Sequence, residues 1–161
     1  GGAVVVAAAL ILQTQRYLGL SLPLLQESFN GQAHVYDFIG KLFFTVLSLG
    51  AGYQGGEVTP LFEIGATLGA ALAPLLHVSV PFLAGLGFIG VFSGATNTPI
   101  ACFVMGIELF GSQAAVYFFM ICLISFMCSG NNGIYSAQQV AVKKGILFLP
   151  IVKRIKEKNK V

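Results

Sequence analysis

The chain has 161 residues, a length that suits one domain, and 56% of them are hydrophobic while only 9% are charged. Soluble domains carry about 25% charged residues, so this composition excludes an ordinary soluble domain. A collagen or a flexible linker could also hold 20 glycines, but either contains far less apolar sequence. We therefore expect a glycine-rich bundle embedded in a membrane.

The charged residues are concentrated at the end of the chain. No Asp, Glu, Lys or Arg lies between Glu63 and Glu108, or between Glu108 and Lys143. Each interval is longer than the roughly 20 residues that cross a bilayer. Most of the nine Lys and Arg residues lie at or after Lys143, so the net charge of +3 indicates a basic tail rather than a nucleic-acid-binding surface. We predict a membrane domain over 1–149 and a basic tail over 150–161, which the positive-inside rule places in the cytoplasm.

The apolar segments are short and are separated by glycines and prolines. In chain order we expect them at about 1–14, 17–29, 34–52, 58–77, 80–93, 98–110, 112–128 and 134–149. The start at Gly1-Gly2, without Met or a basic segment, predicts a fragment whose natural start lies upstream. Alternating strands are rare, so the fold class is predicted to be all-α, with helices that stop partway through the membrane. The expected breaks are Gly50 to Gly52, Gly55-Gly56, Pro60, Pro74, Pro81, Gly94, Pro99, Gly111, Gly130 and Gly133.

Broken helices inside a membrane indicate a transport site, because lipid cannot satisfy the exposed backbone groups. A helix N-terminus offers free N–H groups and suits an anion. By contrast, the small-residue spacings from Gly65 to Gly69 and from Gly90 to Gly94 are typical of close helix packing. Cys102, Cys122 and Cys128 lie in apolar stretches without a metal-binding pattern, so we expect buried thiols and neither metal nor cofactor.

The segment Gly55-Gly56-Glu57-Val58-Thr59-Pro60 carries the clearest chemistry. Two glycines break one apolar helix, and a proline follows where the next helix begins and where its missing N–H costs nothing. Glu57 and Thr59 then flank the amide donors of a helix N-terminus. This geometry suits an anion, and the carboxylate allows protons to compete for the same site. The alternative is that Glu57 only caps the helix.

Three blocks in the right order resemble CLC anion channels and transporters. GGEVTPLFEIGATLGA is similar to the segment that opens the selectivity helix in the second half of that family, and its Glu-Val-Thr variant resembles the CLC-F fluoride/proton antiporters. The segments GATNTPIAC with MGIELF and Gly133-Ile134-Tyr135-Ser136 are similar to later helices. The resemblance implies the second half of an inverted repeat, with the gating-glutamate half missing.

The resemblance also implies roles for individual residues. Gly56, Glu57, Val58 and Thr59 would form the anion path, with the amides of Glu57 and Val58 lining it and the side chains of Glu57 and Thr59 handling fluoride and protons. Tyr135 would donate a hydrogen bond to the anion. Val58 stands where chloride-type members have phenylalanine, which favours the fluoride branch.

The remaining charged residues leave alternatives open. Glu63 lies four residues after Thr59 on nearly the same helix face, and is either a proton relay or the partner of a polar group from the missing half. We expect Glu108 to be held by hydrogen bonds between helices. We expect structural roles for His34, near Asp37, and for His77, at a helix C-terminus. Lys41 either pairs with Asp37 or extends to the lipid headgroups.

The predicted function is fluoride export coupled to protons, by a multi-pass protein of the inner membrane and not an enzyme. The alternatives are a chloride or nitrate transporter or channel, and a non-transporting half that needs a partner. The expected partners are fluoride or chloride, protons and lipid. A homodimer is implied by the resemblance of about 97–110 and 113–128 to the family's dimer helices, although Phe103, Val104, Ile107, Phe118 and Phe119 suit a lipid-facing surface equally well.

Overall fold

The structure is a computed structural model, and it describes residues 2–11, 16–53, 55–131, 133–135 and 138. All regular structure in these residues is helical, so the predicted all-α class is confirmed. The helices are α1 (Gly2–Ile11), α2 (Leu22–Asn30), α3 (Asp37–Gly50), α4 (Val58–Leu76), α5 (Val80–Thr96), α6 (Pro99–Phe110), the 3₁₀ turn η1 (Ser112–Ala114) and α7 (Ala115–Cys128).

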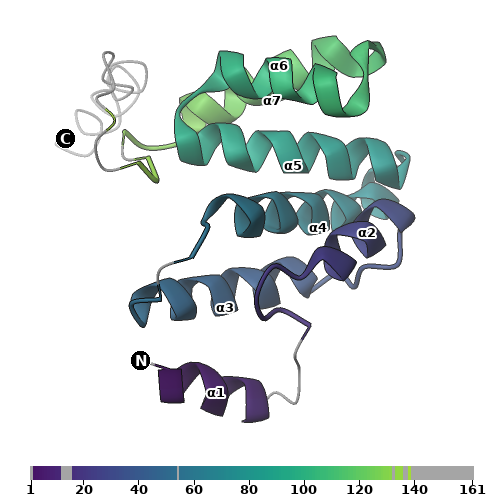
Figure 1. Ribbon diagram of the computed structural model, residues 1–161. Coiled ribbons are helices and arrows are strands. Elements are labelled where there is room, and N and C mark those ends of the chain that lie inside the picture. The colour runs from purple at the N-terminus through teal and green to yellow at the C-terminus, as the bar shows by residue number, and fades with distance from the viewer. Residues whose placement is uncertain (1, 12–15, 54, 132, 136–137, 139–161) are drawn as a thin grey trace, which may run out of the picture.

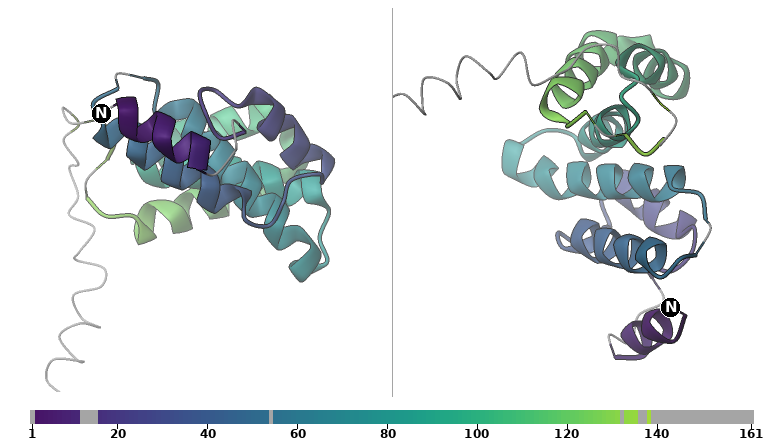
Figure 2. Two further views of the ribbon diagram at one scale, coloured as in Figure 1. Left: turned by 90° about the horizontal axis from the view of Figure 1, so that it is seen from below. Right: turned by 90° about the vertical axis from the view of Figure 1, so that its left-hand side faces the viewer.

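The helices stack in layers that nearly follow chain order. Figure 1 shows α1 at one end, then α3, then α4 with α2 beside it, then α5, and finally α6 with α7. The same order is visible from the side in Figure 2, where α1 stands apart from the rest of the stack. The core lies between α4, α5 and α7, and is built from small residues and aromatic rings such as Ala66, Ala84, Phe88 and Phe118.

Glycines allow α4 and α5 to pack backbone against backbone. A Cβ atom on Gly65 would overlap the carbonyl oxygen of Gly87, and one on Gly69 would overlap that of Leu83. The two helices are therefore antiparallel, and the start of α4 lies beside the end of α5. Next to this contact the rings of Phe62 and Phe88 stack at a centroid distance of 4.0 Å. The predicted close packing at Gly65 and Gly69 is confirmed.

Two of the predicted breaks are wrong. Helix α4 continues through Pro74 to Leu76, because a proline one turn before a helix end disturbs only the last turn. Helix α5 continues through Gly94 to Thr96, and Gly94 instead makes room for α7, since a Cβ atom there would lie 2.6 Å from the Ser125 hydroxyl oxygen. The helix ends instead at Asn97, which adopts the left-handed conformation that asparagine tolerates.

The lengths of the helices agree with a bundle of short membrane segments. Among the described residues, α4 is the one helix long and apolar enough to cross a membrane, with 19 residues from Val58 to Leu76. Helices α5, α6 and the η1–α7 unit are apolar but shorter. The segment predicted at 17–29 becomes helical only at Leu22, after a turn in which Gly19 and Ser21 have positive φ. Most of the segment predicted at 134–149, and all of the tail over 150–161, lie outside the described residues.

Candidate functional site

The N-terminus of α4 has the architecture that its sequence predicts. Glu57 occupies the N-cap position, Val58 is the first helical residue, and Pro60 lies in the first turn. The carboxylate of Glu57 makes no capping hydrogen bond to the helix, so side-chain capping does not account for this residue. The amides of Val58 and Thr59 precede the first intrahelical hydrogen bonds and point out of the helix end. The helix therefore presents donors and a partial positive charge.

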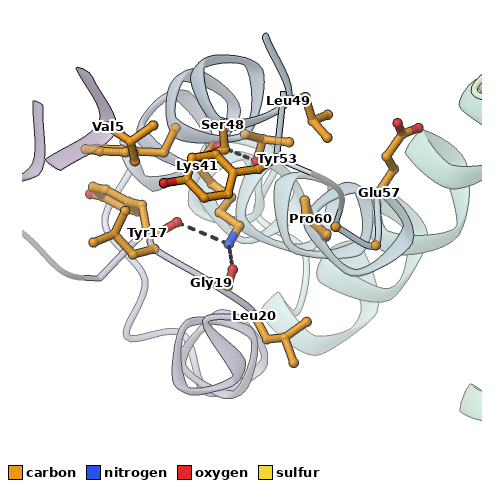
Figure 3. Close-up of a pocket in the computed structure, with 15 residues that line it drawn as sticks. Val5, Tyr17, Gly19, Leu20, Lys41, Ser48, Leu49, Tyr53, Glu57 and Pro60 are labelled. Carbon is orange, nitrogen blue, oxygen red and sulfur yellow. Dashed lines mark hydrogen bonds between the residues drawn. The ribbon is translucent and has the colours of Figure 1, made fainter. Parts of the chain in front are cut away.

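A cavity of about 470 Å³ lies beside this helix end. Its walls come from α1, from the 17–20 turn, from α3 and from the start of α4 (Figure 3). Gly55, Gly56, Glu57 and Pro60 line it on the α4 side. Its two charged lining residues are Glu57 and Lys41, and in Figure 3 the carboxylate of Glu57 points away from the Lys41 ammonium.

The structure brings some of the predicted anion-path residues to this cavity and leaves others outside it. Gly56 and Glu57 line the cavity, whereas Val58 and Thr59 lie half-buried on the first turn of α4 and are not part of its wall. Tyr135 is 49% exposed and does not line the cavity either. Its segment is nevertheless held at the same end of the α4–α5 pair, because the Ile134 amide donates to the Ala95 carbonyl at 2.9 Å.

Glu63 forms an ion pair that sequence reasoning missed. Its Oε2 atom lies 2.7 Å from the Nζ atom of Lys41, and the two side chains are 0% and 1% exposed. The partner of Glu63 thus comes from α3 of this chain, so the expected partner from a missing half is wrong. Both alternatives for Lys41 are wrong as well, since the ammonium neither pairs with Asp37 nor extends to a surface.

The Lys41 ammonium is also bound to the turn before α2. It donates to the carbonyl oxygen of Gly19 at 2.8 Å, to the hydroxyl of Ser21 at 3.0 Å and to the carbonyl oxygen of Tyr17 at 3.3 Å. One side chain therefore joins this turn, α3 and α4. A cation within an apolar helix signals a buried counter-charge, but its position in sequence does not reveal which carboxylate supplies it.

Asp37 forms a second buried polar cluster at the start of α3. Its carboxylate accepts hydrogen bonds from Arg16 at 2.9 Å, from the Tyr17 hydroxyl at 2.8 Å and from the His34 amide at 2.8 Å. Arg16 also pairs with Glu27 of α2. Burial raises the pKa of the Tyr17 phenol, and the hydrogen bond to Asp37 raises it further, to about 12. This cluster fixes the turn that forms one wall of the cavity, and His34 has the predicted position near Asp37.

The sequence similarity of this chain identifies its family. A sequence profile described as voltage gated chloride channel matches residues 1–130. The chain belongs to the voltage gated chloride channel family, CLC. The predicted family is therefore confirmed.

The related proteins come from bacteria and archaea. The chain is 50% identical over 139 residues to a chloride/fluoride channel protein of Pseudomonas syringae pv. tomato, an alignment that covers 86% of this chain and 31% of that protein. It is 34% identical over 104 residues to an uncharacterized protein of Methanocaldococcus jannaschii, covering 62% of this chain and 26% of that protein. This CLC chain thus spans about a third of the length of its relatives.

A solved structure confirms the CLC-type fold. The crystal structure of a CLC-type fluoride/proton antiporter matches with a TM-score of 0.80 and 39% sequence identity, over 85% of this chain and 35% of that one.

Four further expectations concern residues away from the cavity. Glu108 is exposed and forms no hydrogen bond or ion pair with the described residues, so the expected hydrogen bonds between helices are absent from this part of the chain. Phe118 is 2% exposed and lies in the core, so it is not a lipid-facing residue. His77 follows the last residue of α4, as predicted. The thiols of Cys102 and Cys122 are buried, as expected, whereas Cys128 is exposed.

Proposed function

We propose that the full-length protein containing this chain exports fluoride across the membrane in exchange for protons. The observation that carries this proposal is the N-terminus of α4. The helix begins within the Gly-Gly-Glu-Val-Thr-Pro segment, beside a cavity, and Glu57 makes no capping hydrogen bond. Similarity to a CLC-type fluoride/proton antiporter supports it. The protein would then be a transporter and not an enzyme.

The anion would bind at the amides of Glu57 and Val58. Fluoride is small and strongly hydrated, so it leaves water only for strong donors that are already in place, and a helix N-terminus supplies them. Gly56 allows the anion to approach the backbone, because it has no side chain. Thr59 would add a hydroxyl from the first turn. Tyr135 would donate from its phenol, because its segment is held at the same end of the α4–α5 pair.

Glu57 would couple protons to this anion. Its carboxylate stands at the helix end where an anion binds, so the anion and the ionised carboxylate compete for the same positive potential. Protonation of Glu57 removes that competition and admits fluoride. Glu63 is the second proton-coupling candidate, and lies inside the bundle on the same helix.

The second candidate function is chloride transport or a passive channel. It is favoured by the name of the Pseudomonas syringae relative, which mentions both chloride and a channel. Selectivity in this case would depend on parts of the pore outside this chain. The two functions differ in which anion moves faster and in whether protons move with it.

The test is anion efflux from liposomes that hold the full-length protein, followed with a fluoride electrode and then a chloride electrode. We expect fast fluoride efflux, slow chloride efflux and proton movement in the opposite direction. Equal or faster chloride efflux would support the second candidate. Absence of both fluxes would favour a non-transporting subunit.

Glu57→Gln is the variant that tests the site. We expect slower fluoride turnover or a changed proton-to-fluoride ratio, because glutamine cannot exchange a proton. The matched control is Glu108→Gln, which makes the same chemical change at an exposed residue without a partner in the described chain. Wild-type turnover and stoichiometry in Glu57→Gln would refute the role of Glu57.

Location and assembly follow from the same proposal. We propose a multi-pass protein of the inner membrane with the 150–161 tail in the cytoplasm, and a homodimer formed through α6 and α7. These two helices carry a row of exposed apolar side chains that need lipid or a partner: Ile100, Val104, Leu109, Val116, Tyr117, Met120 and Ile124. Cross-linking of Val104→Cys in native membranes would detect the dimer, and exclusive monomers would argue for lipid.

A further inference from the structure

The buried pair of Lys41 and Glu63 does more than join two helices. We propose that it is a proton-dependent electrostatic switch for the anion site. When Glu63 takes up a proton, Lys41 keeps its charge, and the net charge of the pair beside the cavity changes from zero to +1. This inference rests on the proposed function, and it assigns to the pair a part in coupling that Glu57 alone would not supply.

The surroundings of Lys41 allow it to remain charged without Glu63. The ammonium has three hydrogens and four oxygen neighbours, namely Glu63 Oε2, the carbonyl oxygens of Gly19 and Tyr17, and the hydroxyl of Ser21. Three of these oxygens belong to the turn before α2 and do not titrate near neutral pH. Lys41 therefore keeps three hydrogen-bond acceptors from the protein when Glu63 becomes neutral, and these hold the ammonium in the same position.

The surroundings of Glu63 leave it able to accept a proton. Among the described residues, Oε2 has one partner, the Lys41 ammonium at 2.7 Å, whereas Asp37 has three donors. The Oε1 atom is buried and without a donor, so a proton can add there while Oε2 still faces the ammonium.

Asp37 is the contrasting case, because it is equally buried but accepts three hydrogen bonds, from Arg16, Tyr17 and His34. Those donors hold Asp37 ionised. The difference in hydrogen bonding assigns a structural role to Asp37 and a titrating role to Glu63.

The pair acts on the anion site through the cavity. Lys41 lines the same cavity as Gly56 and Glu57. Glu63 is not part of the cavity wall and lies six residues after Glu57, on α4. The other ionisable side chains in that wall are Tyr17 and Tyr53.

The size of the effect follows from the size of the cavity. A compact cavity of about 470 Å³ is about 10 Å across. At an effective dielectric constant of about 20, one unit charge at about 10 Å changes the affinity for a monovalent anion on the order of tenfold. Proton uptake at Glu63 thus tightens fluoride binding about tenfold, and fluoride binding promotes proton uptake by the same factor.

Three variants of the full-length protein test the switch in liposomes. Glu63→Gln fixes the pair at +1, so the half-saturating fluoride concentration should fall about tenfold at high pH and change less with pH. Lys41→Met should raise this concentration about tenfold only at a pH high enough to ionise Glu63 without its counter-charge. The double variant, Lys41→Met with Glu63→Gln, has a neutral pair like the wild type at high pH. It should regain wild-type affinity there and show the same reduced pH dependence as Glu63→Gln.

Two further variants separate the switch from a purely structural role. Lys41→Arg keeps the charge and should keep the pH dependence. Asp37→Asn perturbs a buried carboxylate that does not line the cavity, and should lower stability without removing the pH dependence. If Glu63→Gln and the double variant keep the wild-type pH dependence, the inference is overturned while the proposed function stands.

A second measurement needs no transport. Fluoride is added to purified full-length Glu57→Gln in weakly buffered detergent, and proton uptake is read with a pH electrode. Because Glu57 can no longer titrate, proton uptake that accompanies fluoride binding comes from other groups. We expect a measurable fraction of a proton in Glu57→Gln, and a smaller uptake when Glu63→Gln is added to it. Binding of fluoride without proton uptake would overturn the inference, and a failure to bind fluoride at all would count against the proposed function itself.

Discussion

Adding one methyl group at Gly69 should separate α4 from α5. A Cβ atom at this position would overlap the carbonyl oxygen of Leu83 and lie 2.7 Å from its carbonyl carbon and 2.8 Å from the Cα of Ala84. All three atoms are backbone, so no side chain can rotate away. Since ordinary contacts of this kind begin near 3.4 Å, α5 must move by roughly an ångström in Gly69→Ala.

The expected loss of stability combines three terms. Overpacking of a tight contact costs about 1–3 kcal/mol. Separation of the helices also weakens the stack of Phe62 on Phe88, and such pairs contribute about 0.5–1.5 kcal/mol. Alanine regains about 1 kcal/mol over glycine in a helix interior. We therefore expect Gly69→Ala to lower the free energy of unfolding by about 0.5–3.5 kcal/mol.

The assay is unfolding of the full-length protein from mild detergent by added SDS, followed by circular dichroism. Gly85→Ala is the matched control, because it makes the same substitution in α5 where the new Cβ atom would lie 3.7 Å from the Phe110 ring, an ordinary contact. The control should be neutral or stabilising by up to about 1 kcal/mol. Equal stability of Gly69→Ala and Gly85→Ala would refute the close-packing argument.

Two other substitutions should act on the buried polar clusters. Tyr17→Phe removes the 2.8 Å hydrogen bond to Asp37 but keeps the ring beside Phe44. We therefore expect stability in the same SDS assay to fall by about 1–2 kcal/mol. Unchanged stability would mean that the hydrogen bonds from Arg16 and His34 are enough to stabilise the buried Asp37 carboxylate. Lys41→Met leaves Glu63 buried without a counter-charge, so it should lower the free energy of unfolding by about 3–5 kcal/mol. Adding Glu63→Gln to this variant should restore part of the lost stability. A double variant no more stable than Lys41→Met would contradict the pairing of these two residues.

Local sequence signals predicted where several helices begin and end. The Gly-Gly break and Pro60 predicted a helix that starts near residue 58, and α4 starts at Val58. Pro99 and Gly111 likewise mark the two ends of α6. These signals are strong because a proline without an N–H and a glycine with positive φ act on the backbone next to them, whatever the tertiary surroundings.

Signals that depend on neighbouring helices were less reliable. Pro74 and Gly94 carry the same residue types as true breaks, yet both lie inside helices. Gly94 is needed for the approach of Ser125, thirty-one positions further along the chain, which no local pattern shows. Phe118 has the sequence context of a lipid-facing residue, and its burial follows from the contact of α7 with α5 and α6.

The sequence by itself determined the all-α class, the short apolar helices, the glycine contacts of α4 and the CLC resemblance of the segment around Glu57. Only the tertiary structure decided which charges meet. Lys41 and Glu63 lie in different helices, and the turn that carries Gly19 and Ser21 precedes both. Their pairing depends on how α3, α4 and that turn are placed, because a charge buried in an apolar bundle takes whichever counter-charge the packing brings within reach.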